Sequence, residues 1–488
     1  MKKILCAVLA VLMVLSFAAG CNNGKDPSKS TPKKGESTNS TSSGEVKNDN
    51  RDRVDAVGSK YATGIEIFKP TKEQRNVRIM WSVNWDYWQK QHTEENPDFH
   101  IVTKRVWEET TGGQAVVEVV AETEQHQYIA SAVASGIAPD IIPAIASTYP
   151  SWQMTNFTKF FDDADIKDHI ELSNTDLWDF PASDEYKWNG HYSWLIPKKT
   201  RDPLVIVYNK AKFDLAGEKT PMEYYKEGKW TWTQFKKTAR SMTDVKKNEY
   251  GYTGFFLKHS YYLPIKRDVK SGDFYVDWND TRWSKWQTEL FDFYQTLPLG
   301  PRRDYNSDNY KTLFPGGSDA MTSCYLSDFA AMYAISKESG GDELRIAPIY
   351  VLDVLGDKEI IPKEKVWGYC ICAAAVNPVG AAEYIRLEAL IAKNIEKEQP
   401  EFGALDSYLT EDEKKALRYT NELLDKRQID PKDKIYGIGG SSVINDFLNE
   451  VVYGEATKTF QTVIESCKPE IEESVRANNK ILQQYMGK

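Results

Sequence analysis

The chain has 488 residues, of which 41% are hydrophobic, 27% charged and 12% aromatic, and its formal net charge is −9. This length predicts about three domains, and the composition excludes collagen-like and wholly disordered proteins. Segments 1–21 and 22–60 each carry a net charge of +2, so residues 61–488 carry −13. Such an acidic body argues against a nucleic acid partner, because phosphate binding needs clustered basic charge.

The first 21 residues are typical of a secretion signal. Two lysines at positions 2 and 3 precede an apolar run, 4–19, which is short for a membrane-spanning helix and ends in small residues. The sequence Ala18-Ala19-Gly20-Cys21 resembles the lipobox of bacterial lipoproteins. This resemblance implies a lipoprotein signal peptide over 1–20 and a lipid on Cys21, which would anchor the chain on the extracytoplasmic face of the cell membrane. The alternative is an ordinary secretory signal in which Cys21 is incidental.

Residues 21–60 are rich in Ser, Thr, Lys, Asn, Gly and Pro and contain almost no apolar side chains. Such a segment cannot bury enough surface to offset its chain entropy, so we expect a disordered, lipid-anchored tether. A flexible linker of this length reaches about 35 Å, enough to hold a folded domain clear of lipid headgroups.

The remaining chain alternates short apolar runs with helical patterns. The strands are expected at 77–81, 115–120, 141–142, 204–208 and 366–376, and the helices at 125–135, 231–242, 380–395, 416–424 and 443–488, the last interrupted at Pro469. This β-α-β order predicts a parallel sheet with helices on both faces.

The cysteine pattern beyond Cys21 favours buried thiols. Four cysteines remain, at 324, 370, 372 and 467, without metal-type spacing. Cys370 and Cys372 lie two apart in a strand-like run and should point to one face, which does not suit a local disulfide. We expect unpaired buried thiols, and a bridge from Cys324 to Cys467 stays open as an alternative.

Enzyme signatures were not found in the sequence. It lacks a phosphate-binding loop, a nucleophile elbow, a zinc-binding His-Glu-x-x-His motif and a dinucleotide fingerprint after a strand. The six histidines are scattered, and the acidic pairs are most simply explained as solvated surface. We therefore expect no enzyme, no cofactor and no metal site. A secreted carbohydrate-active hydrolase stays open as an alternative function, because it would also be acidic and rich in tryptophan.

Several motifs together resemble one protein family. They are Ala134-Ser135-Gly136-Ile137-Ala138-Pro139-Asp140, the segment Gly190–Pro197 followed by Val207-Tyr208-Asn209-Lys210, Thr231-Trp232-Thr233-Gln234-Phe235, and Ala320-Met321. Their order and spacing are similar to those of the extracellular solute-binding proteins (family 1 type) of bacterial carbohydrate ABC transporters. The first motif makes physical sense without a ligand, since Gly136 suits a helix end and Pro139 blocks helix propagation.

The resemblance implies an α/β, two-lobed periplasmic-binding-protein-like (type II) fold with a ligand cleft between the lobes. We expect lobe one at 70–198 plus 366–428 and lobe two at 199–365 plus 429–488. The implied function is a lipid-anchored binding protein that captures a carbohydrate, most simply an oligosaccharide, and delivers it to the permease subunits of an ABC transporter. It is expected to be a monomer. A solute sensor that presents its ligand to a membrane kinase is a further alternative.

Candidate ligand-binding residues follow from the rule that ligands bind beyond the carboxyl ends of strands in open α/β sheets. Sugar rings offer a C–H face to aromatic side chains and hydroxyls to polar ones. The residues that combine these properties with positions after expected strands are Asn84, Trp85, Glu122, Trp152, His259, Tyr261, Ser323 and Tyr325. Trp367 and Tyr369 are added because they lie where the chain is expected to return to lobe one.

Overall fold

The structure is a computed structural model that describes residues 60–485 apart from 94–96, 122–123, 145–150, 155–156, 185, 200, 255–262, 269, 298–313, 315–316, 318, 342 and 427–457. The expected signal peptide, Cys21 and the tether up to residue 59 lie outside these residues, as do Glu122, His259 and Tyr261. Within the described part no helix is both long and apolar enough to cross a membrane.

Lobe one is built on a four-stranded sheet with the order β11-β3-β1-β2. Its strands are β1 (Val77–Trp81), β2 (Ala115–Val119), β3 (Ile141–Ala144) and β11 (Gly368–Ile371). β2 and β3 both run parallel to β1, as the sequence predicts, whereas β11 pairs antiparallel with β3. The carboxyl ends of β1 to β3 and the start of β11 therefore meet at one edge.

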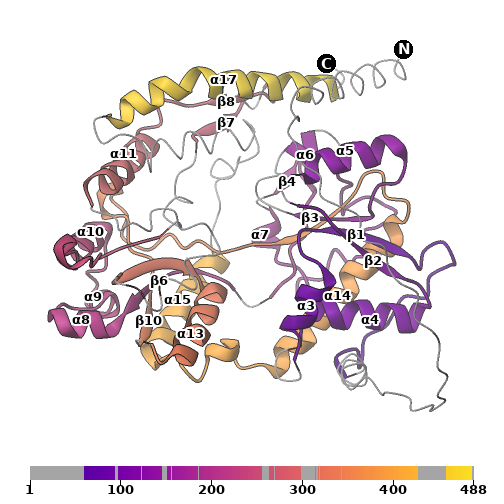
Figure 1. Ribbon diagram of the computed structural model, residues 1–488. Helices are drawn as coiled ribbons and strands as arrows, with labels where there is room; N and C mark the ends of the chain where they lie inside the picture. The colour runs from indigo at the N-terminus through magenta and orange to yellow at the C-terminus, as the bar shows by residue number, and fades with distance from the viewer. Residues whose placement is uncertain are drawn as a thin grey trace, which may run out of the picture. The chain divides into compact units, whose positions relative to one another are not determined.

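Helices cover both faces of this sheet, as Figure 1 shows. They are α3 (Trp85–Gln91), α4 (Phe99–Thr111), α5 (Gln125–Ser135), α6 (Ser151–Met154), α7 (Phe180–Asp184) and α14 (Pro378–Glu398). One core cluster combines Val77, Ile79 and Ile141 with residues of α4 and α14. A second cluster combines Met80, Ile142 and residues of α5 and α6, so alternate residues along each strand serve opposite faces.

The Pro-Asp motif is structural, as predicted. Gly136 ends α5 in the left-handed conformation, with φ 72°, which costs glycine nothing. The buried Asp140 carboxylate accepts hydrogen bonds from the backbone N–H groups of Arg78 (2.9 Å) and Asn377 (2.8 Å). Asp140 thereby fixes the start of β3 to β1 and to the N-terminus of α14.

Lobe two contains a three-stranded antiparallel sheet with the order β10-β6-β9. Its strands are β6 (Leu204–Asn209), β9 (Met321–Tyr325) and β10 (Leu344–Pro348). Its helices are α8 (Lys210–Ala216), α9 (Pro221–Lys226), α10 (Trp232–Ser241), α11 (Thr281–Thr296), α13 (Leu326–Ser339), α15 (Glu411–Lys426) and α17 (Phe460–Tyr485). Two hairpins, β4 (Lys187–Trp188) with β5 (His191–Tyr192) and β7 (Ile265–Arg267) with β8 (Phe274–Val276), and short 3-10 turns complete the described elements.

Two expectations about the C-terminal half need correction. Segment 366–428 does not return to lobe one as a block, because α15 packs on β10 and the Glu413 carboxylate accepts from the N–H of Ile346 at 2.9 Å. The break expected at Pro469 is also absent, since α17 continues through it. The crossing back into lobe two thus occurs after α14.

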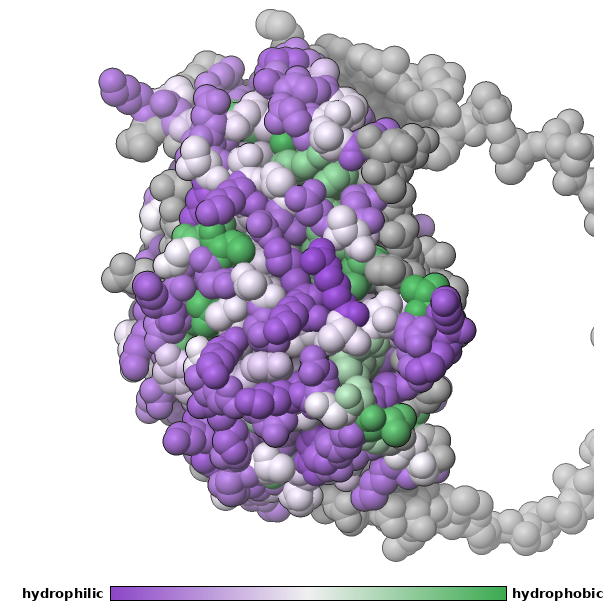
Figure 2. All heavy atoms as spheres, turned by 90° about the vertical axis from the view of Figure 1, so that its left-hand side faces the viewer, coloured by the Kyte–Doolittle hydropathy of each residue, from purple (hydrophilic) through white to green (hydrophobic). Residues whose placement is uncertain are grey.

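The described cysteines form no disulfide with one another, and those at 324, 370 and 372 are buried. Cys370 and Cys372 belong to the same core cluster, in agreement with their predicted common face. Figure 2 views the protein from the side of α8 to α11, where hydrophilic residues dominate and hydrophobic ones form small, separate spots. Among the described residues, this face shows no broad apolar area of the kind that marks a binding surface.

Candidate functional site

Two tryptophans meet at the carboxyl edge of the lobe-one sheet. Trp81 is the last residue of β1, and Trp367 directly precedes β11. Their rings lie edge to face, with centroids 6.4 Å apart. Both side chains are partly buried, so each keeps some surface toward solvent. The edge therefore carries the aromatic surface that the strand-end rule leads one to expect.

Trp367 is held by neighbours on several sides. Phe99, the first residue of α4, stacks on it almost in parallel, with centroids 5.4 Å apart and planes 11° apart. Tyr369 meets it edge to face at 5.4 Å. The ammonium of Lys199 lies over the indole, 4.4 Å from the centroid. Trp367 is thus a fixed ring rather than a mobile surface side chain.

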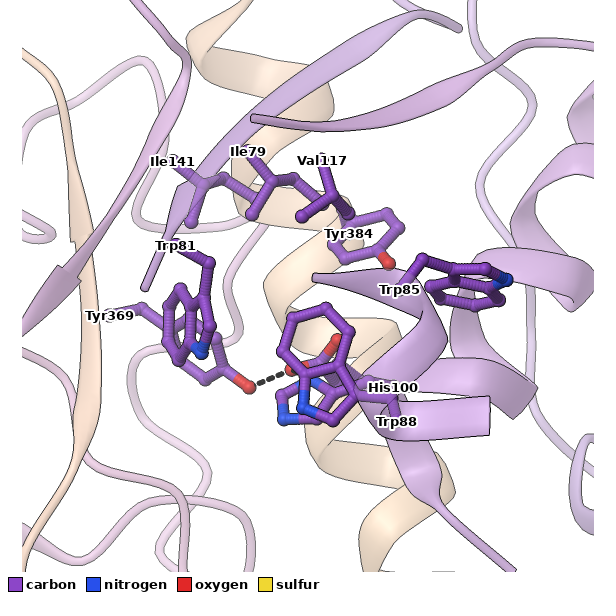
Figure 3. A pocket seen from close by; sticks show the side chains of 10 residues that line it. Ile79, Trp81, Trp85, Trp88, His100, Val117, Ile141, Tyr369 and Tyr384 are labelled. Carbon is purple, nitrogen blue, oxygen red and sulfur yellow. Dashed lines mark hydrogen bonds and ion pairs between the residues drawn. The ribbon is translucent and has the colours of Figure 1, made fainter. Parts of the chain in front are cut away.

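A small hollow lies beneath this edge, between the sheet and helices α3, α4 and α14. Figure 3 shows the side chains that line it: Ile79, Trp81, Trp85, Trp88, His100, Val117, Ile141, Tyr369, Tyr384 and Glu388. The free space holds about one water molecule, which is too little for a sugar ring. The side chains around the hollow hold the Trp81–Trp367 edge in place, and the hollow itself is not the ligand site.

Glu388 is the centre of a buried set of polar side chains beside this hollow. Its carboxylate lies 3.0 Å from His100 Nδ1 and accepts a hydrogen bond from the Tyr369 hydroxyl. Burial alone would lower the pKa of His100, but the neighbouring Glu388 carboxylate raises it above its ordinary value. Burial, together with Glu388, raises the pKa of Tyr369 well above its usual range. Tyr369 is therefore a neutral donor that positions Glu388, and its ring lies within the core.

The residues predicted after β1 have structural roles. The exposed Asn84 is the N-cap of α3, and its side-chain oxygen accepts from the N–H of Tyr87 at 2.9 Å. Trp85 follows it, partly buried, with its ring edge to face with Trp88 and the Lys104 ammonium 5.4 Å from its centroid. Both stay candidates, because part of each side chain remains accessible.

Three predicted ligand residues are wrong, and the first is Tyr369, which is buried in the first core cluster of lobe one and donates its hydroxyl to Glu388. Trp152 is fully buried in the second core cluster of lobe one, so its ring cannot meet a ligand. Ser323 is also fully buried, because Met321–Tyr325 is the strand β9 itself and Ser323 lies at its centre, 2.8 Å from the Tyr252 hydroxyl. The prediction had placed it in a loop after a strand. Tyr325, at the end of β9, is only partly buried and stays a candidate.

Sequence reasoning missed Trp81, Phe99, Lys199 and the His100–Glu388 pair. Trp81 could have been found as an aromatic residue at the very end of a buried strand. The others come from separate segments and reach the edge only through the packing of α4 and α14 and the path of the chain near residue 199. Over the described residues no cluster of three His, Cys, Asp or Glu side chains could hold a metal ion.

Comparison with known proteins agrees with this architecture. The family profile of bacterial extracellular solute-binding proteins matches residues 90–387. No curated protein matches the chain.

Among solved structures, a solute-binding protein from Thermotoga lettingae TMO bound with alpha-D-tagatose is 16% identical, with a TM-score of 0.56 over 83% of this chain and 99% of that one. One from Agrobacterium radiobacter K84 in complex with ribitol is 17% identical, with a TM-score of 0.56 over 84% and 100%. The GacH receptor of Streptomyces glaucescens, solved with acarbose, is 14% identical, with a TM-score of 0.57 over 83% and 98%.

These likenesses show a two-lobed, type II periplasmic-binding-protein-like fold. Proteins of the matched family bind solutes and are not enzymes, so the hydrolase alternative is set aside. The profile covers more than half of the chain. The chain therefore belongs to the bacterial extracellular solute-binding proteins.

Proposed function

We propose that this protein is a lipid-anchored receptor that captures a carbohydrate between its lobes and delivers it to the permease subunits of an ABC transporter. The observation that carries the proposal is the aromatic edge formed by Trp81 and Trp367. Indole rings offer flat apolar surface to the C–H face of a sugar, and partly exposed rings at a strand-end edge suit that use. Sugars and polyols bound to the similar structures support the same ligand class.

An oligosaccharide is the proposed ligand. Trp85 of lobe one and Tyr325 of lobe two are each only partly buried, and several accessible rings can serve successive sugar units. Glu122, His259 and Tyr261 lie outside the described residues and stay predictions as further contacts. We expect the receptor to work as a monomer that closes its lobes around the ligand.

A glycan panel tested by thermal shift examines the ligand class. A ligand at 100 times its Kd adds about 2.7 kcal/mol to the stability of the folded state, which a melting curve detects. Trp367→Ala should weaken binding of a glycan identified in this way about 30-fold, as expected for loss of an aromatic anchor worth about 2 kcal/mol. Trp152→Ala is the matched control, because it removes a core indole and should leave affinity per folded molecule unchanged. Unaltered affinity in Trp367→Ala would contradict this site.

The lipid anchor rests on the lipobox resemblance at Cys21 and on the polar segment that follows it. Cys21→Ser should release the protein from the membrane fraction into the medium and remove the mobility shift due to the lipid. Retention of the variant in membranes with unchanged mobility would refute the anchor without affecting the carbohydrate proposal.

A further inference from the structure

Two of the chain segments that connect the lobes pair with each other, one leading into lobe two and the other returning to lobe one. Pro203 and Glu364 form an antiparallel bridge, and the N–H of Leu204 donates to the carbonyl of Lys363 at 2.7 Å. On the lobe-one side, Leu195 and Tyr369 exchange two backbone hydrogen bonds of 3.1 and 3.0 Å. A change of lobe orientation must bend the chain between these two pairings.

Lys199 and Trp367 both lie in that interval, one on each segment. The Lys199 ammonium is 4.4 Å from the centroid of the Trp367 ring, within the range of a favourable cation–π contact. Phe99 already covers part of the same ring by parallel stacking. Lys199 therefore occupies part of the ring surface that a sugar would use.

We propose that Lys199 and the carbohydrate compete for the same face of Trp367, which makes Lys199 a specificity-determining residue of the site. This inference rests on the proposed function, because it assigns the Trp367 ring to the ligand. A ligand must replace an ammonium–indole contact with a C–H–indole contact, and the ammonium must move along the segment that bends with the lobes. Neutral ligands that cover the ring poorly are thereby disfavoured.

Carboxylates near Lys199 can pair with its ammonium when a ligand displaces it from the Trp367 ring. Asp202, Glu364 and Glu396 interact favourably with it, whereas Lys365 and His100 of α4 oppose its charge. Burial lowers the pKa of Lys199 to about 8. At pH 9 most of the amine is therefore neutral and the cation–π attraction is lost. Competition should weaken as the pH rises from 7 to 9.

Acrylamide quenching of tryptophan fluorescence tests whether Lys199 covers the ring, without any ligand. Ten of the fourteen tryptophans are buried, and only those at 81, 85, 278 and 367 are partly accessible. Lys199→Ala should increase quenching, and the increase should vanish in a Trp367→Phe background. Lys198→Ala is the matched control, because Lys198 is exposed and its ammonium points to the carbonyl of Thr175 at 3.4 Å. Equal quenching in the wild type and Lys199→Ala would overturn the proposal.

Titration with maltotetraose, cellotetraose, mannotetraose and xylotetraose tests the competition. Lys199→Met keeps an apolar stem but removes the charge, and it should bind a tetrasaccharide about 2- to 5-fold more tightly at pH 7, from the strength of a cation–π contact that keeps some access to solvent. The gain should disappear at pH 9. Weaker binding by Lys199→Met would overturn the proposal, because Lys199 would then be a ligand contact. Failure of all four glycans to bind any variant would count against the proposed function. The quenching experiment needs no ligand, so it would still decide whether Lys199 covers Trp367.

Discussion

Replacing Arg201 with methionine should be among the most damaging changes outside the hydrophobic core. Arg201 Nη1 contacts the carboxylates of Asp179 and Glu364, the latter at 2.9 Å, and Nη2 lies 2.7 Å from Asp425. These partners come from lobe one, from the returning connection and from α15 of lobe two. One guanidinium therefore neutralises carboxylates from three separate parts of the chain.

The exposed fractions decide the size of the effect. The side chain of Arg201 is 14% exposed, and those of Asp179 and Glu364 are 7% and 3% exposed, whereas that of Asp425 is 64% exposed. Removing one partner of a buried ion pair costs about 3–5 kcal/mol, because the other charge stays buried and unpaired. An exposed pair contributes about 0.2–1 kcal/mol. We expect Arg201→Met to lower the free energy of unfolding by about 4 kcal/mol and Asp425→Asn by less than about 1 kcal/mol.

Urea denaturation at pH 7 and at pH 4.5 measures both variants. In Arg201→Met the carboxylates of Asp179 and Glu364 stay buried without their cation, and protonation at low pH relieves the cost of these buried charges. The deficit relative to wild type should therefore be smaller at pH 4.5 than at pH 7. A loss below about 1 kcal/mol at pH 7, or a loss equal to that of Asp425→Asn, would refute the assignment of Arg201 as a buried charge centre.

Three further changes test other parts of the structure. The folded-state pKa of His100 is raised, so its charged contact with Glu388 stabilises the protein below about pH 6.5. This stabilisation is lost as the pH rises through the folded-state pKa. His100→Gln should therefore cost more stability at pH 6 than at pH 8.5. Equal losses in urea at both pH values would show that His100 acts only by packing. Trp152→Ala should lower the unfolding free energy by about 3–5 kcal/mol, and a loss under about 1 kcal/mol would mean that the ring is not core. Gly113→Ala should cost at least about 1–3 kcal/mol, because an added Cβ would lie 1.9 Å from the carbonyl oxygen of Arg75. Gly136→Ala is the comparison, because its Cβ would meet nothing within 4 Å. It should cost only about 1 kcal/mol, for its left-handed backbone. Matching losses for the two glycines in denaturant would contradict the close approach.

Much of lobe one could be predicted because its signals are local. The buried runs that become β1, β2 and β3 are bounded by helices whose ends are marked by Gly112 and Gly136. Thr410 and Glu413 also form a reciprocal cap at the start of α15, which is the local Thr-x-x-Glu pattern of a capping box. What the local pattern could not say was which lobe α15 joins, because that depends on the contact of Glu413 with β10, far away in the sequence.

The candidate site was less predictable for the same reason. Trp367 was found because it lies at the start of the segment expected to return to lobe one, but its stacking on Phe99 and its contact with Lys199 join three distant segments. Ser323 was misplaced because a short apolar run does not show where a strand begins. Trp152 was misplaced because the sequence does not tell a core indole from a ligand-facing one.

The central claim is that the two lobes close around a carbohydrate that the protein binds without changing it. The most direct measurement titrates the purified protein with the best glycan from the panel, records small-angle scattering with and without it, and analyses the recovered glycan. We expect saturable binding of one ligand per chain, a smaller radius of gyration at saturation and a chemically unchanged glycan. An unchanged radius of gyration at saturation, or recovery of a cleaved glycan, would contradict the account.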